Sequence, residues 1–295
     1  MTNDQADVLR QLVRESAEAD TSVPVARPGL IVVAGGQSGV GTTTIAVNLA
    51  AVLAGRGKKV VLVDADCDGG GVALQCGLDD HYSHTVADVL SGRRTVGEVL
   101  QPGPASVRVL PGVWGLEKLT DYPAAAGGRL LSQLATLGSH TDLVVMDVGH
   151  SPHGLAPSFW RAADFVLAVT TPQPEAIMDT YASIKSHGSE IRASVGAVVN
   201  RVPTSEEAAS VHARLARVCH RFLGLKLGRL GSIGSDPQVA AAGPAGKPVV
   251  LAAAESLAAR QFGELADAVS ADERLAAWSA PLPSSASPSA DRLTA

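Results

Sequence analysis

One segment near the start of the sequence has the residue types and spacing of a phosphate-binding loop. It reads Gly36-Gln37-Ser38-Gly39-Val40-Gly41-Thr42-Thr43-Thr44 and fits the frame G-x-x-x-x-G-K-[ST] apart from its lysine. Glycines let the backbone wrap around a phosphate, and a helix that starts directly after them points free N–H groups at it. The Thr43 hydroxyl is placed to reach a Mg²⁺ ion. We therefore predict that these nine residues contact the phosphates of a nucleotide.

The lysine of this frame is absent, because Thr42 occupies its position. A lysine there brings a full positive charge close to the β- and γ-phosphates. At ~4 Å and an effective dielectric constant near 20, such a charge pair is worth roughly 4 kcal/mol. Threonine cannot supply this attraction, so we expect the loop to bind a triphosphate more weakly than a loop with lysine.

Three aspartates follow apolar runs further along the chain. Asp64 and Asp66 end the first run, and Asp147 follows Leu143-Val144-Val145-Met146. A strand that ends in an acid is how phosphate-loop proteins bring a carboxylate to the Mg²⁺ side of the site. An acid at a strand end also serves as a helix cap, and for Asp66 alone the two interpretations are equally good.

Alternating strands and helices must position these residues. The pattern predicts strands at 30–34, 60–64, 107–110, 143–147, 165–170, 197–200 and 227–233. It predicts helices at 43–53, 124–137, 174–187, 205–222 and 251–269. Such alternation indicates an α/β fold with a mostly parallel twisted sheet flanked by helices, in which ligands lie beyond the carboxyl ends of the strands.

The remaining segments suggest the domain organisation. Residues 1–18 predict a helix with an apolar face, and residues 19–29, which contain two prolines, predict a linker that tethers it. The nucleotide-binding domain is expected at 30–280. The small polar residues of 281–295 predict a disordered tail.

Net charge and cysteine spacing limit the ligands and sites that we expect of this chain. The formal net charge of −5 argues against general binding to nucleic acid or to anionic membranes, although it leaves room for a local basic patch. The three cysteines lack the spacing of a zinc site or a disulfide framework. We expect a cytoplasmic protein, because the chain has neither a signal-like start nor a run of about 18 apolar residues.

A dehydrogenase is the alternative that the loop leaves open. The same glycines resemble the T-G-x-x-x-G-x-G turn of short-chain dehydrogenases, with Asp64 at the place of an NAD ribose ligand and Tyr181 and Lys185 in a Y-x-x-x-K pair. However, the sequence lacks an N-N-A-G segment and a serine about a dozen residues before Tyr181. Tyr181 and Lys185 are also an ordinary i, i+4 pair on a helix.

Several segments together resemble the MinD/ParA family of P-loop ATPases. Val63-Asp64-Ala65-Asp66 is similar to the family's D-x-D, whose second carboxylate orients the attacking water. The resemblance implies a Rossmann-like P-loop NTPase fold, with Asp66 as the hydrolytic acid and Asp147 as a Mg²⁺ ligand through water. It also implies ATP/ADP and Mg²⁺ as cofactors, and a homodimer in the ATP-bound state.

Within this family the chain looks most like the FlhG group of flagellar-number regulators. Residues 169–185 are similar to that group's "TTPEP…I.DAYA.IK" segment, and residues 230–237 are similar to its "LG.IPEDP" loop. Asn200-Arg201 resembles its adenine-side N-R turn, which implies that both residues contact the nucleotide. Residues 4–10 match D-Q-A-x-x-L-R. In that group this helix docks on the GTPase FlhF, which implies partner contacts from Asp4, Gln5, Ala6, Leu9 and Arg10.

The chain departs from the family at both lysines of the loop. The usual sequence is G-K-G-G-V-G-K-T, whose first lysine reaches the partner's phosphates across the dimer, and here Gln37 and Thr42 replace the two lysines. Residues 67–71 add a further acid close to the phosphates. We expect slow ATP hydrolysis at best. A pseudo-ATPase scaffold and a pilus-assembly relative of the same fold remain alternatives, and contacts with flagellar switch proteins remain open.

The C-terminal part of the domain contains a helical pattern at 262–278. Its apolar side includes Phe262, Leu265 and Val269, and its charged residues sum to −3. Membrane-surface helices are usually basic, so we expect this helix to pack on the core. The sequence leaves a peripheral position at the inner face of the membrane open.

Overall fold

The computed structural model describes residues 27–66, 71–78, 83–112, 122–138, 140–150, 154–188 and 192–275. The predicted N-terminal helix at 1–18, most of the linker and the predicted tail at 281–295 lie outside the described residues. Residues 67–70 of the acid-containing segment lie outside them too.

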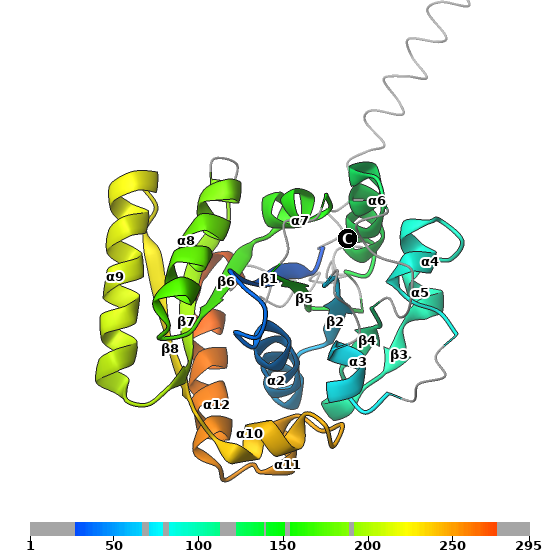
Figure 1. Ribbon diagram of the computed structural model, residues 1–295. Helices are drawn as coiled ribbons and strands as arrows, with labels where there is room; N and C mark the ends of the chain where they lie inside the picture. The colour runs from blue at the N-terminus through cyan, green and yellow to red at the C-terminus, as the bar shows by residue number, and fades with distance from the viewer. Residues whose placement is uncertain are drawn as a thin grey trace, which may run out of the picture.

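The described residues form one sheet of eight strands, in the order β3-β4-β2-β5-β1-β6-β7-β8 (Figure 1). Neighbouring strands are parallel, except for the antiparallel pair β3 and β4 at one edge. The strands are β1 (Gly29–Gly35), β2 (Val60–Asp64), β3 (Gln101–Pro102), β4 (Arg108–Leu110), β5 (Leu143–Gly149), β6 (Phe165–Thr170), β7 (Ser194–Val202) and β8 (Leu227–Gly234).

Helices cover both faces of the sheet. In Figure 1, α2 and α12 lie on one side of the sheet, and α6 and α7 lie on the other. The helices are α2 (Thr42–Gly55), α3 (Gly71–Gln75), α4 (Val86–Leu90), α5 (Val96–Val99), α6 (Ala124–Ala135), α7 (Ala156–Ala162), α8 (Pro174–Gly188), α9 (Ser205–Leu223), α10 (Pro237–Ala242), α11 (Val249–Ala252) and α12 (Leu257–Ser270), with a short 3₁₀ turn at Pro104–Ser106.

Two apolar cores result, one on each face. One joins the sheet to α2, α3 and α12, and the other joins it to α4 through α9. Every residue of β1, β2, β5 and β6 is buried. Parallel strands covered on both faces require such continuous aliphatic runs, so the predicted α/β fold with a mostly parallel sheet is confirmed.

The predicted helix at 251–269 is wrong, because the chain forms two helices there. α11 ends at Ala252, and α12 begins at Leu257 after Ser256, whose side chain accepts the N–H of Ala259 as an N-cap. A serine that caps a new helix competes with continuation of the previous one. Five short helices, α3, α4, α5, α7 and α10, were not predicted.

The apolar side of α12 is buried against the sheet, as we expected of the C-terminal pattern. Phe262, Leu265, Val269 and the following Leu275 all belong to the core on that face. Residues 276–278 of the predicted helix lie outside the described part. No helix of the described residues has both the length and the apolar character needed to cross a bilayer.

An ion pair fixes the point where the chain enters the domain. Both terminal nitrogens of Arg27 donate to the carboxylate of Asp164, at 3.0 and 2.6 Å. The same carboxylate accepts the N–H of Leu30 at 2.8 Å. The last part of the predicted linker, residues 27–29, is therefore held against the start of β6, and β1 already begins at Gly29.

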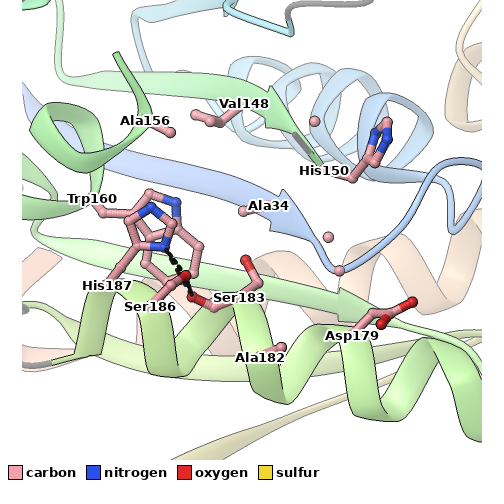
Figure 2. Close-up of a pocket in the computed structure, with 13 residues that line it drawn as sticks. Ala34, Val148, His150, Ala156, Trp160, Asp179, Ala182, Ser183, Ser186 and His187 are labelled. Atoms are coloured by element: carbon pink, nitrogen blue, oxygen red, sulfur yellow. Dashed lines mark hydrogen bonds between the residues drawn. The ribbon is translucent and has the colours of Figure 1, made fainter. Parts of the chain in front are cut away.

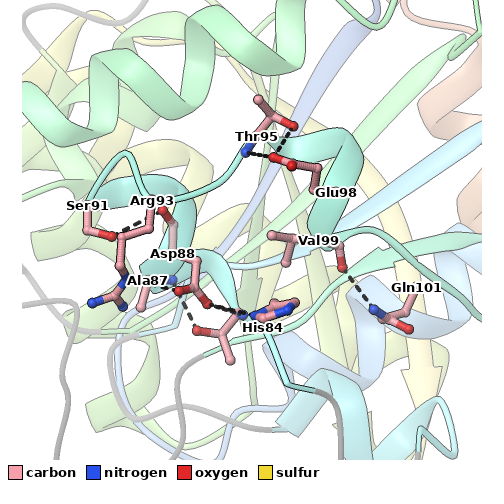
Figure 3. A network of polar contacts seen from close by, with 10 residues as sticks. His84, Ala87, Asp88, Ser91, Arg93, Thr95, Glu98, Val99 and Gln101 are labelled. Atoms are coloured by element: carbon pink, nitrogen blue, oxygen red, sulfur yellow. Dashed lines mark hydrogen bonds and ion pairs between the residues drawn. The ribbon is translucent and has the colours of Figure 1, made fainter.

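The two short helices α4 and α5 are stabilised by capping boxes (Figure 3). At α4 the Thr85 hydroxyl accepts the N–H of Ala87 at 3.2 Å, and Asp88 accepts the N–H of Thr85 at 3.0 Å. Arg93 donates to the other oxygen of Asp88 at 3.0 Å. At α5, Glu98 accepts the N–H and the hydroxyl of Thr95. Helices this short depend on such end contacts for their stability.

The substitution Asp88→Ala tests this capping. Burial by itself raises the pKa of Asp88, but the Thr85 N–H and Arg93 outweigh it and lower the pKa below its usual value. A lowered pKa means that the carboxylate stabilises the fold above its unfolded pKa, and that this contribution is lost as the pH falls. We expect a loss of about 1 kcal/mol in the free energy of unfolding at pH 7.

Urea unfolding between pH 7 and about pH 2.5 measures this loss, which should be nearly constant above about pH 5 and should shrink as the pH falls below the unfolded pKa of about 4. The exposed Asp179→Ala is the matched control, since no cap depends on that side chain among the described contacts. Equal stability of wild type and Asp88→Ala at pH 7 would contradict the capping argument.

Candidate nucleotide-binding site

The phosphate loop joins β1 to α2, as the sequence predicts. Two of its glycines have left-handed backbone angles, with φ of 78° at Gly39 and 98° at Gly41. Gly41 is the N-cap of α2, and its carbonyl accepts the first helical bond from Ile45 at 2.9 Å. Residues with a Cβ rarely adopt these angles, so both glycines are needed for the loop to turn into the helix.

Neighbouring elements approach the loop so closely that glycine is required for a second reason. A Cβ on Gly36 would lie 2.1 Å from the backbone nitrogen of Thr180 in α8. A Cβ on Gly41 would lie 2.3 Å from Nδ2 of Asn200 at the end of β7. That nitrogen donates to the carbonyl of Val40 at 2.8 Å. Contacts with α8 and β7 thus hold the loop in shape without any lysine.

The residues at the two missing lysine positions differ in their surroundings. Thr42 is only 8% exposed, and its methyl group lies 3.0 Å from where a Cβ on Gly35 would stand. Its side chain is thus packed under the loop. Gln37, in contrast, is half-buried, and Ser38 and Gly39 beyond it are exposed at the tip of the loop. Only the Gln37 position therefore leaves room for a longer side chain without repacking.

Three carboxylates gather beside the loop. Asp64 and Asp147 are register partners in the adjacent strands β2 and β5. The carboxyl group of Asp66 lies over Gly149, where a Cβ would come within 2.3 Å of it. Asp64 accepts the N–H groups of Asp66 and Val72 at 3.3 Å. The predicted residues Asp66 and Asp147 are therefore brought together, and Asp64 shapes the loop that carries Asp66.

Asp147 is in an unusual electrostatic position. The Asp147 side chain is fully buried. Burial, together with the charge of Asp64, raises the pKa of its carboxyl group well above the usual value. A hydrogen bond from Thr43 lowers the pKa, the charge of Asp66 raises it, and the N–H of Gly149, 3.2 Å from Oδ1, lowers it again. The other oxygen, Oδ2, has no hydrogen-bond partner among the described residues. A buried oxygen of this kind calls for a cation.

The surroundings of this oxygen fit a hard divalent cation such as Mg²⁺. Thr43 and Asp147 supply a hydroxyl and a carboxylate that lie next to each other, and oxygen is the ligand that Mg²⁺ prefers. No group of three or more His, Cys, Asp or Glu residues in the described part of the chain could hold a metal alone. Mg²⁺ sites that use substrate phosphates and waters need only one or two protein ligands, so the two facts agree.

A cavity of about 650 Å³ lies beside the loop, next to Asn200 and Arg201. We call it the base-side cavity, because the family resemblance implies that these two residues contact the adenine side of a nucleotide. Thr44, Asn200 and Arg201 line it, as do residues of α3 and the segment Ser235-Asp236-Pro237 before α10. Asn200 donates to the loop, and its Oδ1 accepts the N–H of Arg201 at 3.0 Å. Arg201 has a left-handed φ of 55° and is exposed. Both residues therefore border the cavity, and the Asn200 side chain also braces the loop.

A second hollow of about 300 Å³ lies behind the loop, between β1, β5, α7 and α8 (Figure 2). Its wall includes Gly36 and the segment Val148-Gly149-His150 that follows Asp147. Trp160 and His187 stack at its far end, with ring centroids 4.6 Å apart. Sequence reasoning missed this hollow, because its residues are scattered over more than 150 positions and form no motif.

The predicted site residues form two groups around the loop. Thr43, Asp66 and Asp147 gather near Gly149, and Thr44, Asn200 and Arg201 line the base-side cavity. All of them stand at the carboxyl ends of β1, β2, β5 and β7. The predicted partner-binding residues Asp4, Gln5, Ala6, Leu9 and Arg10 lie outside the described residues.

Comparison with known proteins identifies the family. The model of the CobQ/CobB/MinD/ParA nucleotide binding domain matches residues 31–249, which is most of the chain. The chain belongs to the MinD/ParA family. The predicted resemblance is thereby confirmed, and with it a nucleotide-binding domain.

Two curated relatives of this MinD/ParA chain are named for an antiactivator and for flagellum site determination. The antiactivator FleN of Pseudomonas aeruginosa is 34% identical over 215 residues, which cover 71% of this chain and 75% of FleN. The flagellum site-determining protein YlxH of Helicobacter pylori is 30% identical over 207 residues, which cover 69% of this chain and 68% of YlxH. Among solved structures, the cell division ATPase MinD of Pyrococcus furiosus has a TM-score of 0.70 and 26% identity, covering 82% of this chain and 98% of that one.

The dehydrogenase alternative is wrong. In a dinucleotide-binding sheet of order 3-2-1-4-5-6 the first two strands are neighbours, which brings the acid after the second strand to the ribose. In this MinD/ParA chain β5 lies between β1 and β2. Tyr181 is half-buried against the core and Lys185 is exposed on α8, as expected of an ordinary helical pair.

The substitution Asp147→Asn tests the electrostatic account of the site. The amide has the same shape but no charge, so it relieves the repulsion from Asp64 and Asp66. We expect the melting temperature of the protein without nucleotide to rise by several degrees. Stabilisation by Mg²⁺ with nucleotide should be lost in the same variant, because the amide binds the cation poorly.

Differential scanning calorimetry with and without Mg²⁺-ADP measures both effects. Asp142→Asn is the control, since Asp142 stands outside the site and accepts the N–H of Lys59. A lower melting temperature of Asp147→Asn without nucleotide would show that Asp147 is not under electrostatic strain.

Proposed function

We propose that this protein regulates the number or placement of flagella, as a nucleotide-dependent dimer of the FlhG type. The observation that carries the proposal is the similarity to the flagellum site-determining protein YlxH and to the antiactivator FleN, over more than two thirds of the chain. The D-Q-A-x-x-L-R pattern at residues 4–10 supports it independently, because it lies outside the region that the family model matches.

The nucleotide site would hold ATP or ADP at the loop from Gly36 to Thr44, with the base in the cavity beside Asn200 and Arg201. Mg²⁺ would be held by Thr43 and, through a water molecule, by Asp147, and would neutralise phosphate charge. The unpartnered oxygen of Asp147 supports this assignment. Asp66 stands beside Asp147 and Gly149, where its carboxylate would orient an attacking water.

Turnover at this site would be slow. A P-loop normally offsets the charge of the β- and γ-phosphates with lysine, and here Thr42 is packed under the loop. Among the described residues, Arg201 is the only Lys or Arg that lines either cavity beside the loop. The helix N-terminus and loop N–H groups remain, and they favour a bound phosphate without speeding its transfer.

A pseudo-ATPase is the second candidate. In that case the core would bind nucleotide without hydrolysis and would present the N-terminal segment to an FlhF-type GTPase. The buried position of Thr42 favours it, because that side chain cannot turn toward a phosphate without leaving its packed site. The two candidates differ in ATP turnover and share the partner.

The substitution Gln37→Lys tests whether ATP binding and dimer formation depend on the charge at this position of the loop. A lysine at this position would restore the charge that reaches the partner's phosphates. We expect ATP to bind about tenfold more tightly, which corresponds to ~1.4 kcal/mol, and to shift more protein into the dimer. Calorimetric titration with Mg²⁺-ATP and sizing chromatography of the same samples measure the two effects.

Ser132→Lys, on the exposed face of α6, adds the same charge away from the loop and is the control. If Gln37→Lys and Ser132→Lys behave alike, the dimer is built in another way. If the folded wild type binds neither ATP nor ADP, the nucleotide part of the proposal fails.

The substitution Gln5→Ala tests the proposed contact with an FlhF-type GTPase. If residues 4–10 dock on an FlhF-type GTPase, loss of the Gln5 amide should abolish stimulation of GTP hydrolysis while the core keeps its melting temperature. A GTPase assay with purified FlhF-type partner measures stimulation.

Gln11→Ala makes the same change in the same segment but outside the motif, and it should retain stimulation. Full stimulation by Gln5→Ala would remove this residue from the proposed contact.

A further inference from the structure

A basic segment stands out in a chain that is acidic as a whole. Residues 208–234 contain five Lys and Arg residues, two His residues and no Asp or Glu. Since the whole chain has a formal net charge of −5, the rest of it carries −10 (−5 minus +5). The segment covers most of α9 and all of β8, which is an edge strand of the sheet.

The arginines of α9 form a stripe on its outer face. Arg214, Arg217 and Arg221 are spaced by three and four residues and are all exposed, whereas Leu215 and Cys219 face the core. Phe222 follows them and is 64% exposed, with the Arg221 guanidinium 5.4 Å from its ring centroid. An aromatic ring that exposed at the end of a cationic stripe gives the surface an apolar point of contact.

A groove of about 980 Å³ continues this surface past the end of α9. It runs between the start of β7, the turn from α9 to β8, and the end of α12. Of the described residues that line it, Arg192, Lys226 and Arg274 are cationic and Asp272 alone is acidic. The Arg274 guanidinium donates to the carbonyl of Arg192, which links two walls of the groove.

These charges form no ion pairs with carboxylates among the described residues. Elsewhere Arg27, Arg56 and Arg93 form ion pairs with carboxylates. In the described residues no such pair involves the cations of the stripe and the groove, namely Arg192, Arg214, Arg217, Arg221, Lys226, Arg229 and Arg274. Holding like charges together without counter-charges costs free energy, and an anionic ligand recovers it. We call these seven residues with Phe222 the basic surface.

We propose that the basic surface binds an acidic polypeptide segment that also carries apolar side chains. Charge complementarity supplies the attraction, and Phe222 with the half-buried Leu223 and Leu225 supplies apolar contacts. The concave groove suits an extended chain better than a flat bilayer. Among the described lining residues the one aromatic, Phe165, is only 3% exposed, so these residues offer no stacking platform for nucleotide bases.

The basic surface lies at the opposite end of the strands from the nucleotide site. The groove borders the starts of β6, β7 and β8 at Phe165, Ser194 and Gly228, whereas Asn200 and Gly234 border the base-side cavity near the ends of β7 and β8. A partner on the basic surface therefore leaves the nucleotide site accessible. This proposal does not depend on the proposed flagellar function.

Fluorescence anisotropy of the full-length chain with a labelled peptide tests the proposal. The probe is Glu-Asp-Glu-Leu-Asp-Glu-Phe-Glu-Asp-Glu, compared with the same peptide with every acid replaced by its amide. We expect micromolar binding of the acidic peptide that weakens as salt rises, and at least tenfold weaker binding of the amide peptide. Replacing Leu and Phe of the probe by Ala should weaken binding severalfold, because the contacts at Phe222 are lost.

Charge reversals locate the binding. Arg217→Glu and Lys226→Glu should each weaken peptide binding at least tenfold, and Phe222→Ala severalfold. The exposed Lys59→Glu, just before β2, changes the net charge equally and should have less than a twofold effect. Unchanged melting temperatures show that the variants are folded.

Several results would overturn the proposal. One is no binding of the acidic peptide, and another is equal loss in Lys59→Glu and Lys226→Glu, which would mean that only net charge matters. A third is binding of duplex DNA or phosphatidylglycerol vesicles that is at least as tight as that of the peptide and is lost in the same reversals. That outcome would assign the surface to a nucleic acid or a membrane instead.

Discussion

The buried carboxylate of Asp147 is the constraint on which the nucleotide site depends. The register of β2 and β5 places Asp64 directly beside it, and Asp66 folds back over Gly149 on the same edge. One Asp147 oxygen is left without a partner in the described residues. In most P-loops, lysines share the task of balancing such charge. Here Gln37 and Thr42 cannot, so a divalent cation would have to balance both the carboxylates and the phosphates.

The loop keeps its shape by contacts that do not involve the missing lysines. Gly36 lies against the backbone of α8, and Gly41 lies against Asn200, which bonds to the Val40 carbonyl. These approaches require glycine at both positions whether or not the loop carries lysine. The backbone geometry of the loop and the charge of its lysines are thus separate properties, and the sequence has the glycine frame without the lysines.

Much of the fold could be predicted from the sequence, because parallel strands buried on both faces are continuous aliphatic runs. The strands at 60–64 and 165–170 were predicted with their observed bounds. Short helices were missed, since α4 and α5 have only one turn each and depend on capping by Thr85 and Thr95. Both caps follow the pattern of threonine with an acid three residues later, which could have indicated them. The break at Ser256 was missed because the flanking alanines favour helix on both sides.

The candidate site was predicted as a set of motifs, but its assembly could not be. Sequence spacing does not reveal that β5 lies between β1 and β2, and this order decides between a P-loop protein and a dinucleotide-binding enzyme. Nor does it reveal that Thr42 is packed under the loop, or that Asn200 braces it. The bond from Asn200 joins residues 160 positions apart, for which the sequence gives no local signal.

The distribution of charge gives the molecule two unlike ends. Aspartates gather at the carboxyl ends of β2 and β5, beside the loop, whereas arginines and Lys226 gather near the starts of β7 and β8. Because the strands are parallel, these two groups lie at opposite ends of the strands. The length of β7 separates them, which at about 3.3 Å per residue is roughly 30 Å. That separation exceeds the Debye length of ~8 Å at physiological ionic strength, so neither end cancels the field of the other. An acidic overall composition therefore says little about either surface, because each ligand meets the local charge and not the sum.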